Sequence, residues 1–249
     1  MTKTLSYHDA MRYNRHIVLP RIDLSGQEAL LNATVVIIGM GGLGSAAATS
    51  LCASGIGNLV LVDFDTVDNT NLPRQTLFSE QDIGTNKAAA AQKRLCALNS
   101  ACHIKTIEKP FSETDANLIE SAYVVLDCTD NINAKDTINA LCFKHKTALV
   151  TGSAIRFEGQ IFVGLPGKSK CYGCLRQFFQ SPELSCTEAG IFSPVVNIIG
   201  TYQAMLAMQV IMNVGDVPLN TLLTFDGLTH DWHRWALPNT AGCKHCDNN

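Results

Sequence analysis

The sequence carries little net charge and no basic excess. Nineteen lysine and arginine residues stand against 22 aspartate and glutamate residues among 249, a formal net charge of −3. Proteins that bind nucleic acid or anionic membrane surfaces usually carry a positive excess. The composition therefore gives no reason to expect nucleic acid or a membrane as a partner. A site for phosphates would have to be a local concentration of cationic side chains.

The sequence also lacks the apolar core of a signal peptide, and one uncharged stretch has to be weighed as a membrane helix. Residues 1–16 are largely polar and have no apolar core. Residues 189–215 contain no Asp, Glu, Lys or Arg, but Pro194, Asn197 and Gln203 interrupt this stretch. We interpret it as a buried crossover and helix rather than a membrane span, and we expect a cytoplasmic protein.

No repeat, low-complexity segment or linker divides the chain, so we expect one domain over residues 1–249. Hydrophobic residues make up 46% of the sequence, which suits a well-filled core. Ten cysteines without a signal peptide favour a reducing compartment, and metal or thiol chemistry rather than disulfides.

Apolar strands alternate with helices through about residue 150. An N-terminal helical region over 11–31, with a loop at 23–26, precedes them. Continuous apolar runs predict buried strands, and Ala- and Leu-rich segments predict the helices between them. The pattern indicates an α/β fold with a doubly wound, Rossmann-like, mostly parallel sheet. The expected strands are 34–38, 59–63, 104–107, 123–127 and 148–151, and the helices 43–54, 87–98 and 134–144.

Two further strands, expected at 160–165 and 222–226, indicate an elaborated C-terminal half. We therefore divide the domain into a nucleotide-binding half, over about 30–150, and a second half, over about 151–249.

A glycine-rich turn joins the first expected strand to the first sheet helix. Its sequence, GMGGLG, matches the G-x-G-x-x-G pattern, with glycines at Gly39, Gly41, Gly42 and Gly44. Glycine lets the backbone turn tightly and approach a phosphate, and the helix N-terminus offers free N–H groups. Asp63 lies 24 positions after Gly39, near the usual spacing for a carboxylate that binds a ribose. Taken alone, the glycine pattern favours NAD as the bound nucleotide. The alternative is that the turn binds no nucleotide and only packs the helix on the strand.

Charged residues near other strand ends favour ATP over NAD. Arg74 and Lys87 follow the second expected strand, and Asp130 follows the strand at 123–127. Cations neutralise phosphates and a carboxylate binds Mg²⁺, whereas hydride transfer requires neither. Either cation alone could be a solvated surface charge. Together with the glycine turn, they favour a site for ATP and Mg²⁺.

The combined motifs resemble those of the ThiF/MoeB/HesA family, the bacterial relatives of ubiquitin-activating enzymes. The resemblance runs from about residue 11 to residue 246, and the motif set is highly specific. It departs at Pro73, where the family commonly has glutamine. The residues that carry it are 12–16 (RYNRH), 39–44, 63–65 (DFD), 71–75 (NLPRQ), Lys87, 127–131 (DCTDN) and 152–160 (GSAIRFEGQ).

The resemblance implies an adenylyltransferase that uses ATP and Mg²⁺. Its substrate would be the C-terminal glycine of a small ubiquitin-like sulfur-carrier protein ending in Gly-Gly, in molybdopterin or thiamine biosynthesis. Residues 154–160 and 185–190 look closer to MoeB, whereas 225–227 and Trp232 look closer to ThiF. We lean to the molybdopterin side.

The resemblance also implies roles for single residues. Asp63 would hold the ribose, with Asp65 in the same nucleotide site. Asn71, Arg74 and Lys87 would contact the phosphates, and Asp130 would hold Mg²⁺. Arg15 would reach into the ATP site of a neighbouring subunit, so the resemblance implies a homodimer.

Two C-x-x-C pairs, Cys171–Cys174 and Cys243–Cys246, are separated by residues 175–242. Four thiolates suit a closed tetrahedral Zn²⁺ site, which would be structural because no position is left open. A thioredoxin-like redox pair and simple core cysteines are the alternatives. The family also carries such a zinc site, away from the ATP.

Cys186 stands in an expected loop, at a position where the family places a cysteine. One interpretation is a thiolate that attacks the acyl adenylate. The other is an exposed loop cysteine without an essential role, and the sequence does not decide between these two interpretations.

Two other functions remain open for the chain as a whole. An NAD-dependent oxidoreductase explains the glycine turn and Asp63, but not Arg74, Lys87, Asp130 and the cysteine pairs together. A catalytically silent zinc scaffold is the second, and the intact Arg74 and Asp130 count against it.

Overall fold

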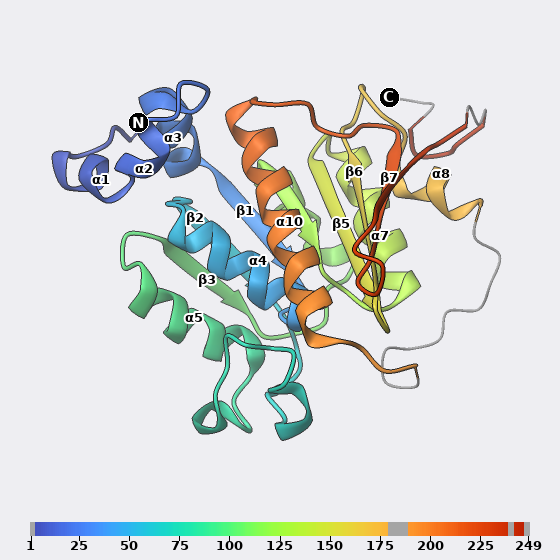
Figure 1. The fold of residues 1–249 in the computed structure, drawn as a ribbon, viewed down its shortest axis with the longest axis horizontal. Helices are drawn as coiled ribbons and strands as arrows, with labels where there is room; N and C mark the ends of the chain where they lie inside the picture. Colours follow the sequence, from blue (N-terminus) through green and yellow to red (C-terminus); the bar gives the residue numbers. More distant parts are fainter. Residues whose placement is uncertain (1–2, 179–188, 239–241, 247–249) are drawn as a thin grey trace.

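A computed structural model describes residues 3–178, 189–238 and 242–246. Within them one sheet runs through the molecule, in the strand order β3-β2-β1-β4-β5-β6-β7-β8 (Figure 1). The first five strands in the sequence are parallel and the last three antiparallel. The strands are β1 (Thr34–Ile38), β2 (Asn58–Val62), β3 (His103–Ile107), β4 (Val124–Asp127), β5 (Ala148–Ile155), β6 (Glu158–Gly164), β7 (Thr221–Asp226) and β8 (Trp232–Ala236).

The central strand β1 is buried on both faces, as its unbroken apolar sequence predicts. Val35 and Ile37 pack into one core with α4 (Gly42–Ala53), α5 (Lys87–Leu98) and α10 (Ser193–Met212). Val36 and Ile38 face the opposite core, against α6 (Ala116–Glu120) and α7 (Ile132–Lys144). Helices therefore cover both faces of the parallel part, and the predicted doubly wound α/β sheet is confirmed.

The order of the strands reverses beside β1. The chain moves outward through β2 and β3, then returns to place β4 on the other side of β1. At such a switch point the loops after the strands separate and leave a crevice beyond their carboxyl ends. The glycine turn after β1 and the loop after β4 are the two walls of that crevice.

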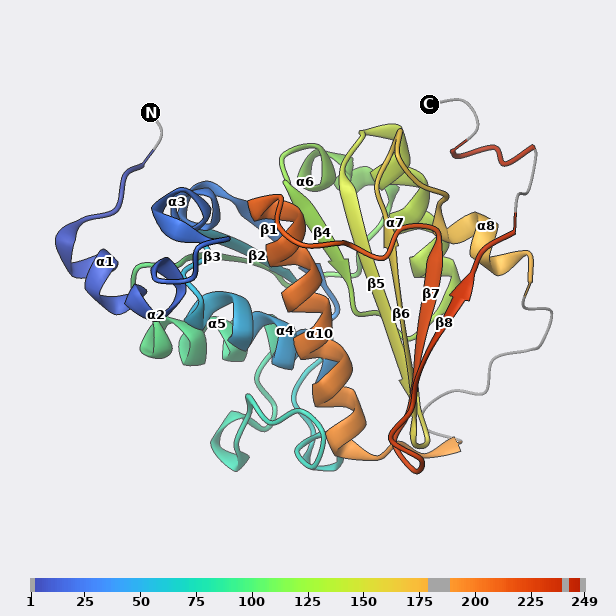
Figure 2. The ribbon, with the colours of Figure 1, turned by 45° about the horizontal axis from the view of Figure 1, so that its top comes forward.

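Helix α10 lies across the sheet, beside α4 and over β5 and β6 (Figures 1 and 2). Of the helices in the described residues, it alone has the length and composition to cross a membrane, with a mean hydropathy of 1.5 and half of that window buried. Val195, Ile199 and Leu206 belong to the main core. The interpretation of residues 189–215 as a buried crossover and helix is thus confirmed.

The N-terminal region differs from the expectation in one place. It forms α1 (Tyr7–Arg12), α2 (Asn14–Ile17) and α3 (Asp23–Asn32), so the expected loop at 23–26 is helical and the break lies at residues 18–22. Gly26 is buried in α3, and a Cβ there would lie 3.0 Å from the Ile22 side chain. The glycine serves close packing rather than a turn.

The remaining short elements lie in loops and near the C-terminal strands. Strand β8 had no sequence prediction, because its residues are all exposed and its pattern is not apolar. The short helices are α8 (Tyr172–Arg176) and the 3₁₀ turns η1 (Asn69–Asn71), η2 (Glu80–Asp82) and η3 (Glu113–Asp115).

Candidate nucleotide site and cysteine cluster

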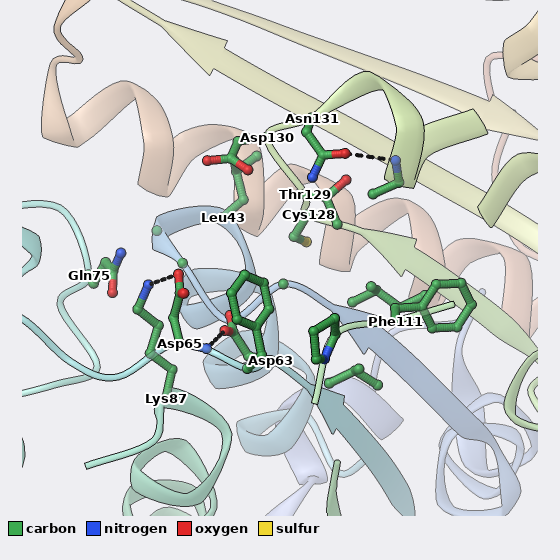
Figure 3. A pocket seen from close by; sticks show the side chains of 18 of the residues that line it. Leu43, Asp63, Asp65, Gln75, Lys87, Phe111, Cys128, Thr129, Asp130 and Asn131 are labelled. Carbon is green, nitrogen blue, oxygen red and sulfur yellow. Dashed lines mark hydrogen bonds and ion pairs between the residues drawn. The ribbon is translucent and has the colours of Figure 1, made fainter. Parts of the chain in front are cut away.

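A cavity of about 840 Å³ lies at the carboxyl ends of β1 to β4 (Figure 3). It unites residues from distant parts of the sequence, from Ile38 at the end of β1 to Val196 on α10. The predicted nucleotide residues that line it are Gly39, Gly41, Gly42, Asp63, Asp65, Asn71, Arg74, Lys87 and Asp130.

The glycine turn is as compact as its sequence predicts. Gly39 has φ +92°, and a Cβ there would lie 2.8 Å from the Cys128 carbonyl oxygen. Gly41 is the N-cap of α4, so the first N–H groups of that helix face the cavity. Gly44 does not line the cavity; a Cβ there would meet the Gly39 oxygen at 1.9 Å. It serves the close packing of the helix on the turn.

Asp63 directly follows β2, and its side chain bonds to the glycine turn after β1. One carboxylate oxygen accepts a hydrogen bond from Met40 N at 2.6 Å, and the other accepts one from Asp65 N at 2.8 Å. Burial raises the pKa of Asp63, while these two N–H groups and the nearby Lys87 act in the opposite direction. The side chain is therefore held rigidly beside the glycine turn, where a ribose hydroxyl can reach it.

Three cationic side chains line the cavity within the described part of the chain. Lys87 Nζ lies 3.0 Å from Asp65 Oδ2, and Lys109 Nζ lies 2.6 Å from Asp115 Oδ1. Arg74 donates to the Thr70 carbonyl oxygen at 2.9 Å. Five carboxylates line the same cavity, so its charge is mixed and phosphates would be bound by these individual cations, not by a positive surface.

Asp130 lies at the rim of the cavity, just before α7. Figure 3 shows it on the far side of the cavity from Lys87. The next residue, Asn131, is the N-cap of α7 and accepts a hydrogen bond from Ala134 N at 2.8 Å. Asp130 is exposed, so its carboxylate is free to bind a hydrated cation.

Two predicted residues are not brought to this cavity. Arg15 is exposed on α2 and does not line it. Cys186 lies outside the described residues.

The cavity also has walls that the motifs did not indicate. They include Lys109, Phe111 and Glu113 after β3, Ile191 just before α10 and Val196 in its first turn. Lys109, Phe111 and Glu113 directly follow a parallel strand, and this position in the sequence could have identified them as cavity residues.

The four cysteines of the two C-x-x-C pairs form one cluster, with all four sulfur atoms within 4.8 Å of one another. Cys171 lies 3.5 Å from Cys243 and 4.0 Å from Cys174, and Cys174 lies 3.3 Å from Cys246. A tetrahedron of sulfurs around zinc, with bonds of about 2.3 Å, has edges of about 3.8 Å. The spacing therefore fits one metal ion of that kind.

The charge properties of the cluster also fit a metal. Burial raises the pKa of Cys171 to about 12 and raises that of Cys246 as well. Burial acts in the same direction on Cys243, but hydrogen bonds from the N–H groups of His245 and Cys246 help lower its pKa to about 7. Four thiolates this close would repel one another, and a divalent cation is what allows all of them to ionise.

Fold and site together define an α/β nucleotide-binding protein of the doubly wound kind, with a separate cluster of four cysteines that could hold a metal. Residues 13–245 match the ThiF family, and the chain belongs to that family.

Two relatives match this chain over nearly its whole length. The molybdopterin-synthase adenylyltransferase of Escherichia coli is 40% identical over 244 residues, which cover 97% of this chain and 98% of the relative. The sulfur carrier protein ThiS adenylyltransferase of the same organism is 41% identical over 240 residues, which cover 96% and 95%.

A solved structure shares the fold. The crystal structure of E. coli MccB with ATP superimposes with a TM-score of 0.83 at 25% identity. The match covers 98% of this chain and 76% of that one.

Proposed function

We propose that this protein is an ATP-dependent adenylyltransferase that activates the C-terminal carboxylate of a ubiquitin-like sulfur-carrier protein. The observation that carries the proposal is full-length identity of about 40% to two adenylyltransferases of that kind. The cavity supports it, because it combines a glycine turn, two fixed aspartates and three cations. A nicotinamide site requires no such group of cations.

The cavity residues divide naturally among the parts of ATP. Asp63 accepts a ribose hydroxyl, and the N–H groups of the glycine turn face the phosphates. Asn71, Arg74 and Lys87 contact the phosphates, with Asp65 in the same site. Asp130 holds Mg²⁺, which when bound neutralises phosphate charge. These assignments are proposals that rest on the position of each residue in the cavity.

The reaction is nucleotidyl transfer. An oxygen of the carrier carboxylate forms a bond to the α-phosphorus of ATP, the bond from that phosphorus to the bridging oxygen breaks, and pyrophosphate leaves. An ionised carboxylate is already a nucleophile, so no general base is required. Arg74 and Lys87 act by positioning the phosphates and neutralising the charge that moves onto pyrophosphate.

The proposal extends to the assembly of the protein and to its cysteines. The protein acts as a cytoplasmic homodimer in which Arg15 reaches the partner's cavity. Residues 1–249 form one functional domain, with the nucleotide half at about 30–150. Zn²⁺ on Cys171, Cys174, Cys243 and Cys246 fixes the C-terminal tail to α8 and takes no part in the reaction. Cys186 acts, if at all, after pyrophosphate has left.

The carrier belongs to the MoaD type or the ThiS type. Relatives of both kinds have nearly the same identity to this chain, 40% and 41%. We favour the MoaD type because residues 154–160 look closer to MoeB.

Carrier-dependent exchange of labelled pyrophosphate into ATP tests the function. The wild type should exchange with at least one carrier ending in Gly-Gly. Asp130→Ala should lower the exchange rate about 100-fold or more, because the metal's charge stabilisation is lost. Glu113→Gln, which neutralises another carboxylate of the same cavity, is the matched control and should remain active. Absence of exchange with every carrier, together with NADH binding, would favour an oxidoreductase instead.

A further inference from the structure

A fully buried ion pair lies beneath the loop that carries Asp130. Lys135 Nζ on α7 is 3.1 Å from Asp127 Oδ2 at the end of β4, and the two side chains are 2% and 1% exposed. The ammonium also donates to Thr151 Oγ1 at 3.2 Å and to the Gly152 carbonyl oxygen at 2.9 Å. All three N–H donors of Lys135 are therefore engaged, and neither member of the pair lines the cavity.

The Asp127 carboxylate also forms hydrogen bonds with the loop that follows β4. Its Oδ2 accepts from Thr151 Oγ1 at 2.6 Å as well as from Lys135. Its Oδ1 accepts two bonds from Thr129, from the backbone N–H at 3.0 Å and from the hydroxyl at 2.7 Å. Thr129 precedes Asp130 directly, so the carboxylate sets the path of the chain into the proposed metal site.

The backbone of Asp127 is held from the other face of the sheet. Gln203 Nε2 on α10 donates to the Asp127 carbonyl oxygen at 3.0 Å and to that of Val150 at 3.2 Å. With Asn131 capping α7 on the far side of the loop, residues 128–130 are fixed at both ends.

Stability alone does not account for this arrangement. Removing two charges from water is costly, and replacing a buried ion pair by apolar side chains is often neutral or stabilising. The hydrogen bonds instead fix the backbone directly before Asp130, one step further from the metal than the partners that bond to a ligand carboxylate itself.

We propose that Lys135 and Thr151 are positioning residues for the adenylation reaction: they hold the Asp127 carboxylate, which fixes Thr129 and thereby the place of Asp130. This inference rests on the proposed function, because Asp130 is the proposed Mg²⁺ ligand. Neither residue touches substrate, so each acts through Asp127.

The test compares four variants. Lys135→Met removes the buried cation, and Thr151→Val removes only the hydroxyl. Thr151→Ser restores that hydroxyl. Arg94→Met breaks another ion pair with a buried carboxylate, that of Asp82, outside the cavity, and controls for general loss of stability.

Two readouts apply to the full-length protein. One is the Mg²⁺ concentration that gives half-maximal pyrophosphate exchange, and the other is the rate of amide hydrogen exchange in residues 128–131. Lys135→Met and Thr151→Val should raise the half-maximal Mg²⁺ concentration about 10-fold or more and speed amide exchange. Thr151→Ser and Arg94→Met should stay near the wild type in both.

A folded Lys135→Met or Thr151→Val protein with wild-type values in both readouts would overturn the proposal. If Lys135→Met does not fold, the comparison of Thr151→Val with Thr151→Ser decides. Absence of pyrophosphate exchange in the wild type would refute the proposed function. In that case amide exchange of residues 128–131, which needs no catalysis, still decides whether these residues position the loop.

Discussion

The ammonium of Lys87 lies 3.0 Å from the carboxylate of Asp65, and only 9% of the lysine side chain is exposed against 50% of the aspartate. The lysine extends from the first turn of α5 and meets Asp65 at the wall of the cavity (Figure 3). A cation this well covered needs a partner, because water reaches little of it. The pair therefore holds the Lys87 ammonium at the wall of the cavity.

We predict that Asp65→Asn destabilises the nucleotide-free protein by about 1–2 kcal/mol, since it leaves a largely buried cation without its partner. Added ATP should recover part of this loss, because phosphate oxygens replace the carboxylate. The free energy of unfolding in urea, with and without ATP, measures both effects. Asp136→Asn breaks the surface pair with Arg176 and should cost close to nothing. Equal costs in the two variants would refute the special role of the Lys87 pair.

A second prediction concerns pH and Asp63. Its carboxylate accepts a hydrogen bond from a ribose hydroxyl more strongly when ionised, and burial raises the pKa of Asp63 above the ordinary value of 3.8. The affinity for ATP should therefore fall as the pH drops through a window above 3.8. The stability of the nucleotide-free protein should change with pH in the opposite direction to the ATP affinity. In that window the folded protein binds more protons than the unfolded chain, so the free energy of unfolding falls as pH rises.

Comparison with Asp63→Ala isolates this titration from those of ATP itself. The ratio of the two ATP dissociation constants should be large near neutral pH and shrink on acidification to roughly pH 4. Calorimetry across that range measures the ratio. A ratio that does not change with pH would show that Asp63 is not the group that holds the ribose.

The sequence reveals the parts of the site that are continuous along the chain. The glycine turn, Asp63 and the β4 loop each directly follow an apolar strand, and the parallel arrangement brings such ends together. It does not reveal contacts that depend on how distant segments pack. A Cβ at Gly42 would lie 2.3 Å from the Val196 side chain, a contact set by the crossing of α10 over α4. No local pattern contains that crossing.

The buried Lys135 illustrates the same limit. In the sequence it is an ordinary lysine on an expected helix, where exposure is the usual state for this residue type. Its burial depends on Asp127 on β4 and on Thr151 and Gly152 on β5, two strands that the sheet places side by side. The exposed strand β8 was missed for the opposite reason, because nothing in its residues distinguishes it from a loop.

The third prediction concerns the cysteine cluster. Freshly purified protein should contain one zinc per chain, and Cys243→Ser should lose most of it. Loss of the metal should lower the Tm on the order of 5–10 °C without changing ATP affinity, because the cluster lies outside the nucleotide cavity. Cys96→Ser, which changes an exposed cysteine outside the cluster, should keep its full zinc content. Well below one zinc per chain in the wild type would contradict the assignment.

The fourth prediction separates adenylation from any later thiol chemistry. Cys186→Ala should retain carrier-dependent pyrophosphate exchange, because that step needs only ATP, Mg²⁺ and the carrier carboxylate. Transfer of sulfur to the carrier should fall more than about 10-fold if the Cys186 thiolate attacks the adenylate, and remain unchanged if it has no essential role. Loss of exchange itself would place Cys186 in the adenylation site or the fold.

The last prediction concerns Arg15, which stands on α2 away from the cavity of its own chain. Tyr13, two positions before Arg15, is buried, and its hydroxyl accepts a hydrogen bond from Asn99 Nδ2 at 2.9 Å, so this segment is firmly attached to the domain. An arginine fixed at the surface can serve a cavity only across an interface. Sites shared between two symmetric subunits would allow this.

Mixing two inactive variants tests the idea. A dimer of one Arg15→Ala chain and one Arg74→Ala chain has one site with both arginines intact, so random mixing should restore about one quarter of wild-type exchange activity. As a control, the Arg15→Ala chain is mixed with an Arg15→Ala/Arg74→Ala double variant. This mixture should show no exchange activity, because no intact Arg15 remains in either subunit. Native mass spectrometry would establish that mixed dimers form. If they form and activity stays absent, Arg15 acts within its own chain or has no role in adenylation, and the shared-site proposal fails.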